Sequence, residues 1–274
     1  MERILVGTLK SIWRYPVKSM QGEKLERSDV DPKGLLGDRA YALWDKHTNR
    51  IASAKNPRKW SSLLNCYATL ERSPQVGQPT PPVTINLDNG STLTSKQSDI
   101  DAHLSDWINR DVKFLSVVPD QPSLDQYWPD VEGTAHQDTL TQLFMPPGTF
   151  FDSCPIHAIT TATLNRLQEL YPDGEFAPCR FRPNLLIDSQ LSQSDFVENN
   201  WVGHTLAIGD YVKLKVDTAC PRCVVTTLAQ EELPRDLTIL QTTAQYNDVI
   251  AGIRLSVIEG GTVSQGDSVW LEKD

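Results

Sequence analysis

The sequence lacks the features that mark several large classes of protein. It has 5 cysteines in 274 residues, far below the density of a disulfide-stapled scaffold. No apolar run approaches the roughly 20 residues that span a bilayer, and no signal-peptide core follows the first residues. We therefore expect a cytoplasmic protein with no membrane partner, in which each thiol is buried, reactive or bound to a metal.

Positive charge is also scarce. The chain has 26 Lys and Arg against 35 Asp and Glu, a net charge of −9, and its pI is near 5.1. Nucleic acids and anionic membranes are bound by basic surfaces. We therefore expect no nucleic-acid partner, although this composition still allows a local basic pocket.

Several common catalytic motifs are missing. The sequence has no Gly-x-Gly-x-x-Gly before a helix, no Gly-x-Ser-x-Gly and no His-Glu-x-x-His. Its 5 histidines have no metal-ligand spacing, and no pair of carboxylates stands out for acid–base catalysis. These absences argue against the most frequent nucleotide-binding, hydrolase and zinc-protease sites.

Short β-forming runs dominate what is present. They are bounded by Gly, Pro, Asn and Asp, and they predict strands at 4–13, 41–44, 67–70, 83–87, 112–118, 185–187, 211–216, 224–227, 253–258 and 268–271. Apolar residues at helical spacing predict two helices, at 99–109 and 161–170. The predicted fold class is mainly β with a few helices (α+β), built from barrels or sandwiches.

Two proline-rich segments suggest how the chain is divided. The segment 73–82 lies between predicted strands and is expected to be a loop. The segment 119–148 has no clear period and is the better candidate for a connection between domains. We therefore predict domains at 1–125 and 131–273. The segment 125–130 between them is either a cover over the site or a plain linker, and the linker is favoured.

The strongest local motif is a Cys-x-x-Cys pair, Cys220 and Cys223. Such a pair can be half of a zinc site, a redox dithiol or two unrelated buried thiols. No second pair of zinc ligands is present, and the Val-Val-Thr-Thr run that follows favours a strand over the helix N-terminus of a redox dithiol. Arg222 beside Cys223 favours a thiolate, which is a soft metal ligand or a nucleophile.

Two basic segments are candidates for binding an anion or a planar ring. Arg180 and Arg182 are two residues apart on a segment predicted to be extended, so their guanidinium groups would point the same way. Lys18, Ser19 and Arg39 could converge on a phosphate. Surface ion pairs and ordinary turns are the competing explanations for both segments.

Taken together and in order, five short motifs resemble a MOSC protein, which carries the molybdenum cofactor sulfurase C-terminal domain after an N-terminal β-barrel domain. The motifs are Tyr15-Pro16-Val17-Lys18-Ser19, Gly37-Asp38-Arg39, Phe181-Arg182-Pro183-Asn184, Cys220-Pro221-Arg222-Cys223 and Gly266-Asp267. The family includes the mitochondrial amidoxime-reducing component and its bacterial counterparts. The resemblance implies an N-terminal β-barrel-like domain followed by a MOSC β-barrel domain.

The resemblance also implies a molybdenum cofactor, in which a single molybdopterin and one cysteine thiolate hold the metal. Cys223 would be the catalytic metal ligand. Lys18, Ser19 and Arg39 would bind the terminal phosphate of the cofactor. The remaining cofactor-binding candidates are Asp152, Ser153, Arg180, Arg182, Asn184 and Arg222. Pyridoxal phosphate is a second cofactor that the family resemblance allows.

The activity implied is the reduction of a small N-oxygenated substrate, such as an N-hydroxylated amidine. Some bacterial relatives carry a fused ferredoxin-like domain, and this chain ends at Asp274. The resemblance therefore implies a separate electron-donor protein, either ferredoxin-like or cytochrome-b5-like with its reductase. Two alternatives remain. One is a sulfur-carrier or cofactor-handling module, in which Cys223 carries a persulfide that Cys220 is available to resolve, and the other is a binding barrel without turnover. Cys66 and Cys179 are interpreted as packing residues.

Overall fold

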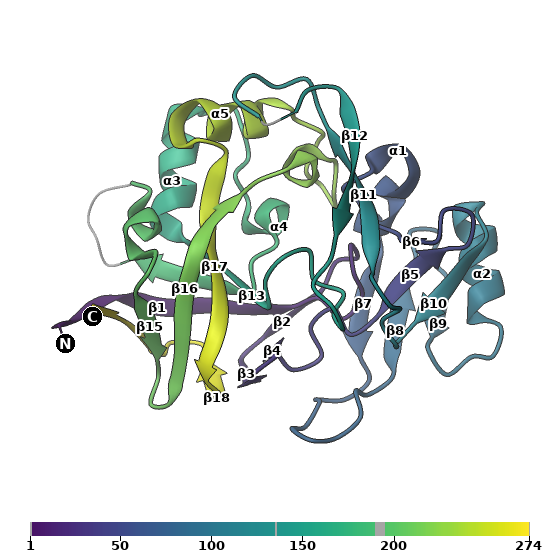
Figure 1. The fold of residues 1–274 in the computed structure, drawn as a ribbon, viewed down its shortest axis with the longest axis horizontal. Helices are drawn as coiled ribbons and strands as arrows, with labels where there is room; N and C mark the ends of the chain where they lie inside the picture. The colour runs from purple at the N-terminus through teal and green to yellow at the C-terminus, as the bar shows by residue number, and fades with distance from the viewer. Residues whose placement is uncertain (1, 135, 190–194, 274) are drawn as a thin grey trace.

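The predicted fold class is confirmed by a computed structural model, which describes residues 2–134, 136–189 and 195–273 (Figure 1). The protein is mostly β, with 39% of residues in strands and 19% in helices. All predicted strands except 224–227 overlap observed strands. Within the described residues, no helix is both long and apolar enough to span a membrane.

A closed barrel of seven strands forms the larger part of the molecule. The strand order is β14-β13-β17-β16-β15-β19-β1, and β1 also pairs with β14, which closes the cylinder. Closure leaves no free sheet edge in this part. The strands are β1 (Glu2–Arg14), β13 (Ile156–Thr160), β14 (Leu185–Ser189), β15 (Thr205–Ile208), β16 (Val212–Pro221), β17 (Ile250–Glu259) and β19 (Ser268–Lys273).

The first strand of the sequence belongs to this barrel, although the other barrel strands lie after residue 155 (Figure 1). Strand β1 pairs with β19 and β14 over most of its length, and its end pairs with β2 (Glu23–Leu25). The chain therefore passes from the barrel wall directly into the first half of the molecule. The division into domains at 1–125 and 131–273 remains a prediction. Strand β1 belongs to the first of these ranges by sequence but pairs with barrel strands of the second.

The first half is built from small antiparallel sheets beside the barrel. One sheet combines β3 and β4 with β18 from the end of the chain, which ties the two halves together. The strands are β3 (Arg27–Asp31), β4 (Gly34–Leu35), β5 (Ala42–Asp45), β6 (Arg50–Ile51), β7 (Tyr67–Leu70), β8 (Val83–Asn86), β9 (Thr92–Thr94), β10 (Val112–Leu115) and β18 (Gly261–Ser264). Strands β5, β6 and β10 form one sheet, and β7, β8 and β9 form another.

The segment predicted to be a linker is instead a hairpin. Strands β11 (Ser123–Trp128) and β12 (Thr139–Phe144) pair over their full length. The prolines that suggested a connection stand outside the paired strands. The hairpin lies between the two halves (Figure 1), and the Tyr127 N–H donates to the carbonyl of Lys55 at 2.8 Å. The interpretation of 125–130 as a plain linker is therefore wrong.

Both predicted helices are present, as α2 (Ile100–Ile108) and α3 (Thr161–Leu170). Helix α3 connects the parallel strands β13 and β14, a pairing that requires a crossover. The sequence patterns did not predict the remaining helical segments, which are α1 (Pro57–Trp60), η1 (Ser61–Asn65), α4 (Pro178–Phe181), η2 (Val197–Trp201) and α5 (Thr238–Asn247).

The predicted strand 224–227 is a short 3₁₀ helix, η3 (Val224–Thr227). The β-forming residues do not pair here because their hydroxyls bond to the preceding turn. Thr226 Oγ1 donates to the Cys223 carbonyl at 3.0 Å, and Thr227 Oγ1 donates to the Val224 carbonyl at 2.8 Å. Such local bonds compete with a strand ladder.

We expect the barrel to depend on the buried face of β1. Leu9 is fully buried in the barrel core, whereas Leu5 on the same strand is 37% exposed. Leu9→Ala should lower the free energy of unfolding by about 2–5 kcal/mol, because it leaves a cavity, whereas the matched Leu5→Ala should cost about 0.5 kcal/mol or less. Chemical denaturation checks both values. Equal losses would show that β1 does not seal the core.

Candidate functional site

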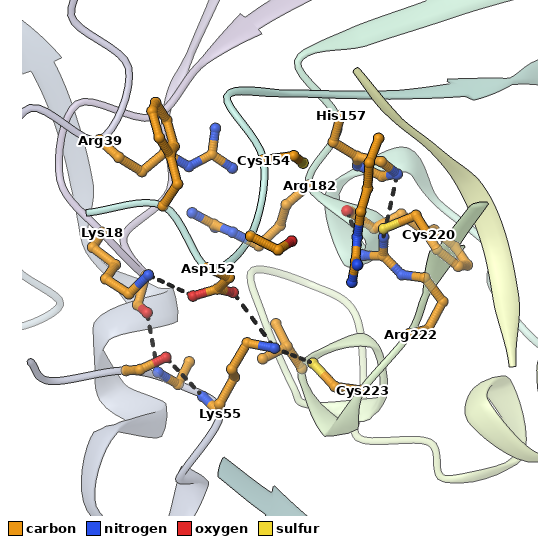
Figure 2. A pocket seen from close by; sticks show the side chains of 18 of the residues that line it. Lys18, Arg39, Lys55, Asp152, Cys154, His157, Arg182, Cys220, Arg222 and Cys223 are labelled. Atoms are coloured by element: carbon orange, nitrogen blue, oxygen red, sulfur yellow. Dashed lines mark hydrogen bonds and ion pairs between the residues drawn. The ribbon is translucent and has the colours of Figure 1, made fainter. Parts of the chain in front are cut away.

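A pocket with a volume of about 840 Å³, including its mouth, is lined by residues from both halves of the chain (Figure 2). The pocket brings together every site residue predicted from the sequence except Arg180. These lining residues are Lys18, Ser19, Arg39, Asp152, Ser153, Arg182, Asn184, Arg222 and Cys223.

The wall of the pocket is strongly basic in a protein of net charge −9. Among the described residues that line it, Asp152 is the one carboxylate. Six cationic side chains share the lining: Lys18, Arg39, Lys55, Arg182, Arg222 and Arg254. A surplus of buried positive charge is unfavourable without a counter-charge. The pocket is therefore suited to an anionic ligand.

Lys18 follows strand β1 in the sequence, and its side chain contacts Asp152 in the pocket. Its ammonium lies 2.5 Å from Asp152 Oδ1 and donates to the Phe150 carbonyl at 2.8 Å. Lys55 Nζ lies 3.5 Å from the other Asp152 oxygen (Figure 2). Burial alone would raise the pKa of Asp152, but the charges of Lys18 and Lys55 hold it well below its usual range.

Three pocket residues have left-handed backbone conformations, with φ of 66° at Ser19, 46° at Arg39 and 51° at Arg182. Side chains other than glycine rarely adopt this conformation, and such strain is concentrated at functional sites. Ser19 Oγ accepts a hydrogen bond from the Ala54 N–H at 3.0 Å. The strained turns are therefore held by contacts within the site.

Arg39 and Arg182 share one aromatic neighbour. Their guanidinium carbons lie 4.4 and 4.3 Å from the centre of the Tyr15 ring, within cation–π range. Arg39 also pairs with the buried carboxylate of Asp38. Arg182 donates to the Met20 carbonyl at 2.7 Å, while its buried Nη1 has no partner. Burial lowers the pKa of Arg182 to about 10.

Asn184 lines the pocket, but its amide group is engaged in the protein. It donates to the Trp13 carbonyl at 3.2 Å and to Asp38 at 3.0 Å, and it accepts from the His157 N–H at 3.1 Å. Asn184 thereby joins β1 to β13 beneath the pocket.

Arg180 is not part of the pocket lining. The segment 178–182 is not extended as predicted, because α4 occupies 178–181 with Pro178 in its first turn. Arg180 is fully buried away from the pocket and donates to backbone carbonyls. Its predicted role in contacting a cofactor is therefore not supported by its position.

The two cysteines of the Cys-x-x-Cys motif differ in their surroundings. Cys220 is buried at the end of β16, and Arg222 Nη1 lies 3.1 Å from its sulfur and 3.2 Å from His157 Nε2. Cys223 is half-buried after the strand, and its sulfur lies 3.6 Å from Lys55 Nζ (Figure 2). The motif thus presents two thiols with separate cationic neighbours.

The Cys220 thiol is stabilised as a thiolate. Burial alone would raise its pKa, but His157 and Arg222 lower the pKa well below the usual range. Gly252 makes room for His157, since a Cβ at this glycine would lie 2.4 Å from His157 Nε2. Cys154, which also lines the pocket, has its pKa raised to about 12 by burial.

The sequence patterns did not predict three of the lining residues, which are Lys55, His157 and Arg254. Lys55 follows β6 without a recognisable motif, and His157 and Arg254 are brought together only because β13 pairs with β17. The partner of His157 across the strands is Arg254. Pairing across a sheet cannot be read from either strand alone.

The donor set of the pocket does not fit a zinc site. No group of three or more His, Cys, Asp or Glu side chains with metal-binding geometry occurs in the described part of the chain. The hypothesis that Cys220 and Cys223 form half of a zinc site is therefore not supported. Buried guanidinium atoms of Arg182, Arg222 and Arg254 lack hydrogen-bond partners, and these donors fit an anionic, multi-acceptor ligand.

Comparison with known families identifies two domains. Residues 6–103 match the family model of the MOSC N-terminal beta barrel domain, and residues 146–270 match that of the MOSC domain. The second match contains Cys220 and Cys223, and the first contains Lys18 and Arg39.

Relatives with similar sequences share about a quarter of their residues with this chain. Human mitochondrial amidoxime reducing component 2 is 26% identical over 238 residues, covering 81% of this chain and 67% of the relative. Human mitochondrial amidoxime-reducing component 1 is 28% identical over 240 residues, covering 81% and 66%. Bombyx mori molybdenum cofactor sulfurase is 24% identical over 298 residues, covering 96% and 33%. The chain thus spans about two thirds of the length of the human relatives.

Among solved structures, the YUAD protein of Bacillus subtilis is similar over 98% of this chain and 97% of that protein. Its TM-score is 0.46 and its sequence identity is 11%.

Inorganic phosphate should raise the melting temperature of the cofactor-free protein, because a ligand that binds only the folded state stabilises it. Arg39→Gln should remove most of this effect, since Arg39 is a cation of the pocket wall. Arg166→Gln, which changes a surface ion pair on α3, is the control and should retain it. Thermal denaturation over a phosphate series provides the measurement. An unchanged effect in Arg39→Gln would place the anion elsewhere.

The lowered pKa of Cys220 predicts a thiolate at neutral pH. The ultraviolet absorbance of the thiolate should persist well below about pH 8.5, where an ordinary thiol titrates. Its contribution to stability is complete above that pH and is lost as the pH falls through the lower folded-state pKa. Cys220→Ser should remove the low-pH absorbance step, and Cys154→Ser should leave it. Persistence of the step in Cys220→Ser would contradict the assignment.

Proposed function

Because the chain belongs to the MOSC proteins, with a MOSC N-terminal beta barrel domain followed by a MOSC domain, we propose that it is a molybdenum-dependent reductase of N-oxygenated compounds. Its cofactor is a single molybdopterin, and Cys223 is the protein ligand of the metal. The names of the human relatives support a reduction of amidoximes, which are N-hydroxylated amidines.

One observation carries the proposal: an anion-binding wall and a pocket-lining thiol share one cavity. A cofactor with a phosphate at one end, an electron-rich ring system and a soft metal needs all of these groups. The partnerless guanidinium atoms of Arg182, Arg222 and Arg254 supply hydrogen bonds that the protein itself leaves unused. The residues present therefore fit the cofactor.

Each part of the wall has a distinct role in holding the cofactor. Lys18, Ser19 and Arg39 bind the terminal phosphate, where the strained turns converge. Arg182 and Asn184 face the pterin, and the bonds of Asn184 to Trp13 and His157 hold its amide in the pocket wall. Further contacts come from Asp152, Ser153 and Arg222.

When bound, the cofactor would supply a redox-active metal for two-electron reduction of the N–O bond. The protein supplies the metal ligand and a balancing charge. The Cys223 thiolate holds the metal, and the Lys55 ammonium 3.6 Å from its sulfur balances the thiolate charge. Reduction of an N-hydroxyl group to N–H and water also consumes two protons and two electrons.

The electrons come from a separate protein, either ferredoxin-like or cytochrome-b5-like with its reductase. The described residues do not offer a cluster of three or more His, Cys, Asp or Glu side chains that could hold a further metal centre. A small N-oxygenated substrate enters the same pocket through its mouth.

A second candidate function is a sulfur carrier or cofactor-handling module. The observation that favours it is that both thiols line one pocket, so that the Cys220 thiolate beside Arg222 is available to resolve a persulfide carried on Cys223. The molybdenum cofactor sulfurase among the relatives is consistent with this class. In this alternative, the protein carries a persulfide and no stoichiometric metal.

The decisive measurement is the molybdenum and pterin content of protein made in cells with and without molybdopterin synthesis. We expect stoichiometric molybdenum only in the first case, together with reduction of an N-hydroxylated amidine when an electron donor is supplied. Cys223→Ser should lose both metal and activity. The matched Cys179→Ser should keep both, because Cys179 does not line the pocket.

Two outcomes contradict the proposal. Full molybdenum content and activity in Cys223→Ser would remove Cys223 from its role. Sulfane sulfur on the protein without metal would favour the carrier.

A further inference from the structure

Arg180 lies outside the pocket, yet its contacts converge on the backbone that carries Cys223. We infer that Arg180 is a positioning residue, whose buried guanidinium fixes the η3 turn and so holds the Cys223 thiol at the pocket wall. This inference rests on the proposed function only in giving Cys223 its role as the metal ligand. The mechanical link between the two residues stands on the geometry alone.

The Arg180 side chain is fully buried, and all of its nitrogens donate to backbone carbonyls. Nε donates to Glu175 at 2.8 Å, Nη2 to Pro234 at 2.8 Å, and Nη1 to Thr226 at 3.3 Å and Leu228 at 3.2 Å. These donors are satisfied by carbonyl oxygens and not by carboxylates. The guanidinium therefore connects three separate stretches of chain to α4.

Two of these carbonyls belong to the segment that begins at Cys223. Thr226, whose carbonyl accepts from Arg180, donates from its N–H and Oγ1 to the Cys223 carbonyl at 3.1 and 3.0 Å. Leu228, the second acceptor, ends the turn through its own N–H bond to Val225. One residue, Thr226, thus links Arg180 to Cys223.

Helix α4, which carries Arg180, also supports two other groups of the pocket wall, Arg222 and Arg182. The Phe181 carbonyl accepts from Arg222 Nη2 at 2.6 Å. The neighbouring Arg182 reaches the pocket, where its Nη2 donates to Met20. Displacement of α4 would therefore move Arg182, Arg222 and Cys223 together. Loss of the Arg180 bonds alone would release only the η3 turn.

Only arginine can make this set of bonds. A guanidinium presents five N–H donors in a planar fork, whereas a lysine ammonium concentrates three donors at one point. Burial lowers the pKa of Arg180, but the group retains its carbonyl partners on several sides. Arg180→Lys should therefore lose contacts to the turn and keep the positive charge.

The test measures the reactivity of Cys223 in cofactor-free protein, made in cells that lack molybdopterin synthesis. Timed alkylation with iodoacetamide is followed by mass spectrometry of tryptic peptides. Cys220 and Cys223 fall on different peptides because Arg222 lies between them. Cys66, which is fully buried in the first half, reports global loosening.

Arg180→Lys should increase the alkylation rate of Cys223 about tenfold, because several bonds that order the turn are lost. The rate at Cys66 should remain at its wild-type value well below the melting temperature. The control Arg166→Lys, on the exposed face of α3, should change neither rate. Unchanged rates at Cys223, or equal increases at Cys223 and Cys66, would overturn the inference.

Thr226→Val provides a second variant if Arg180→Lys does not fold. It keeps Arg180 and removes only the hydroxyl bond to the Cys223 carbonyl. The Cys223 rate should change in the same direction as in Arg180→Lys, by a smaller factor. An unchanged rate would overturn the inference, since the link runs through Thr226. All of these outcomes are independent of whether the protein binds molybdenum, which the metal analysis decides separately.

Discussion

The confinement of like charges in one pocket is the constraint on which the rest of the site depends. Six cationic side chains and one carboxylate share the lining, and each buried charge is unfavourable unless something compensates it. The protein compensates in part, through Asp152 between two lysines and through the ring of Tyr15 beside two guanidinium groups. It leaves several guanidinium atoms without partners. The remaining positive charge is what an anionic cofactor would neutralise.

Holding such a wall together requires a rigid frame, and the first strand provides much of it. Strand β1 closes the barrel against β14 and β19 (Figure 1). Lys18, which follows this strand in the sequence, lines the pocket that both halves share. Asn184 and the Asp38 carboxylate join the end of β1 to β13 and to the Arg39 turn. The pocket is therefore bounded by segments far apart in the sequence. The two thiols of the Cys-x-x-Cys motif line the same pocket, from the end of β16 and the start of η3.

Predictions from the sequence succeeded where the signal is local. Alternating apolar residues located strands such as β7 and β16, and helical spacing located α3 over its full length. They failed where a neighbouring segment decides the outcome. The hairpin β11–β12 is stabilised by pairing between its own strands, which the proline-rich composition of the surrounding segment does not reveal. The β-forming residues of η3 bond backward through threonine hydroxyls instead of joining a sheet.

The sequence by itself determined the identity of the chemical groups: a thiol pair, two basic segments and their order along the chain. Only the tertiary structure decided which of them meet. Arg180 and Arg182 show the physical reason. Arg180 lies within helix α4 and its side chain enters the interior, whereas Arg182 follows the helix in a left-handed conformation and its side chain lines the pocket. Lys55, His157 and Arg254 carry no motif and join the site through strand pairing and the close packing of the two halves. Local sequence patterns specify helices and strands, whereas burial and pairing between distant segments decide which side chains line the pocket.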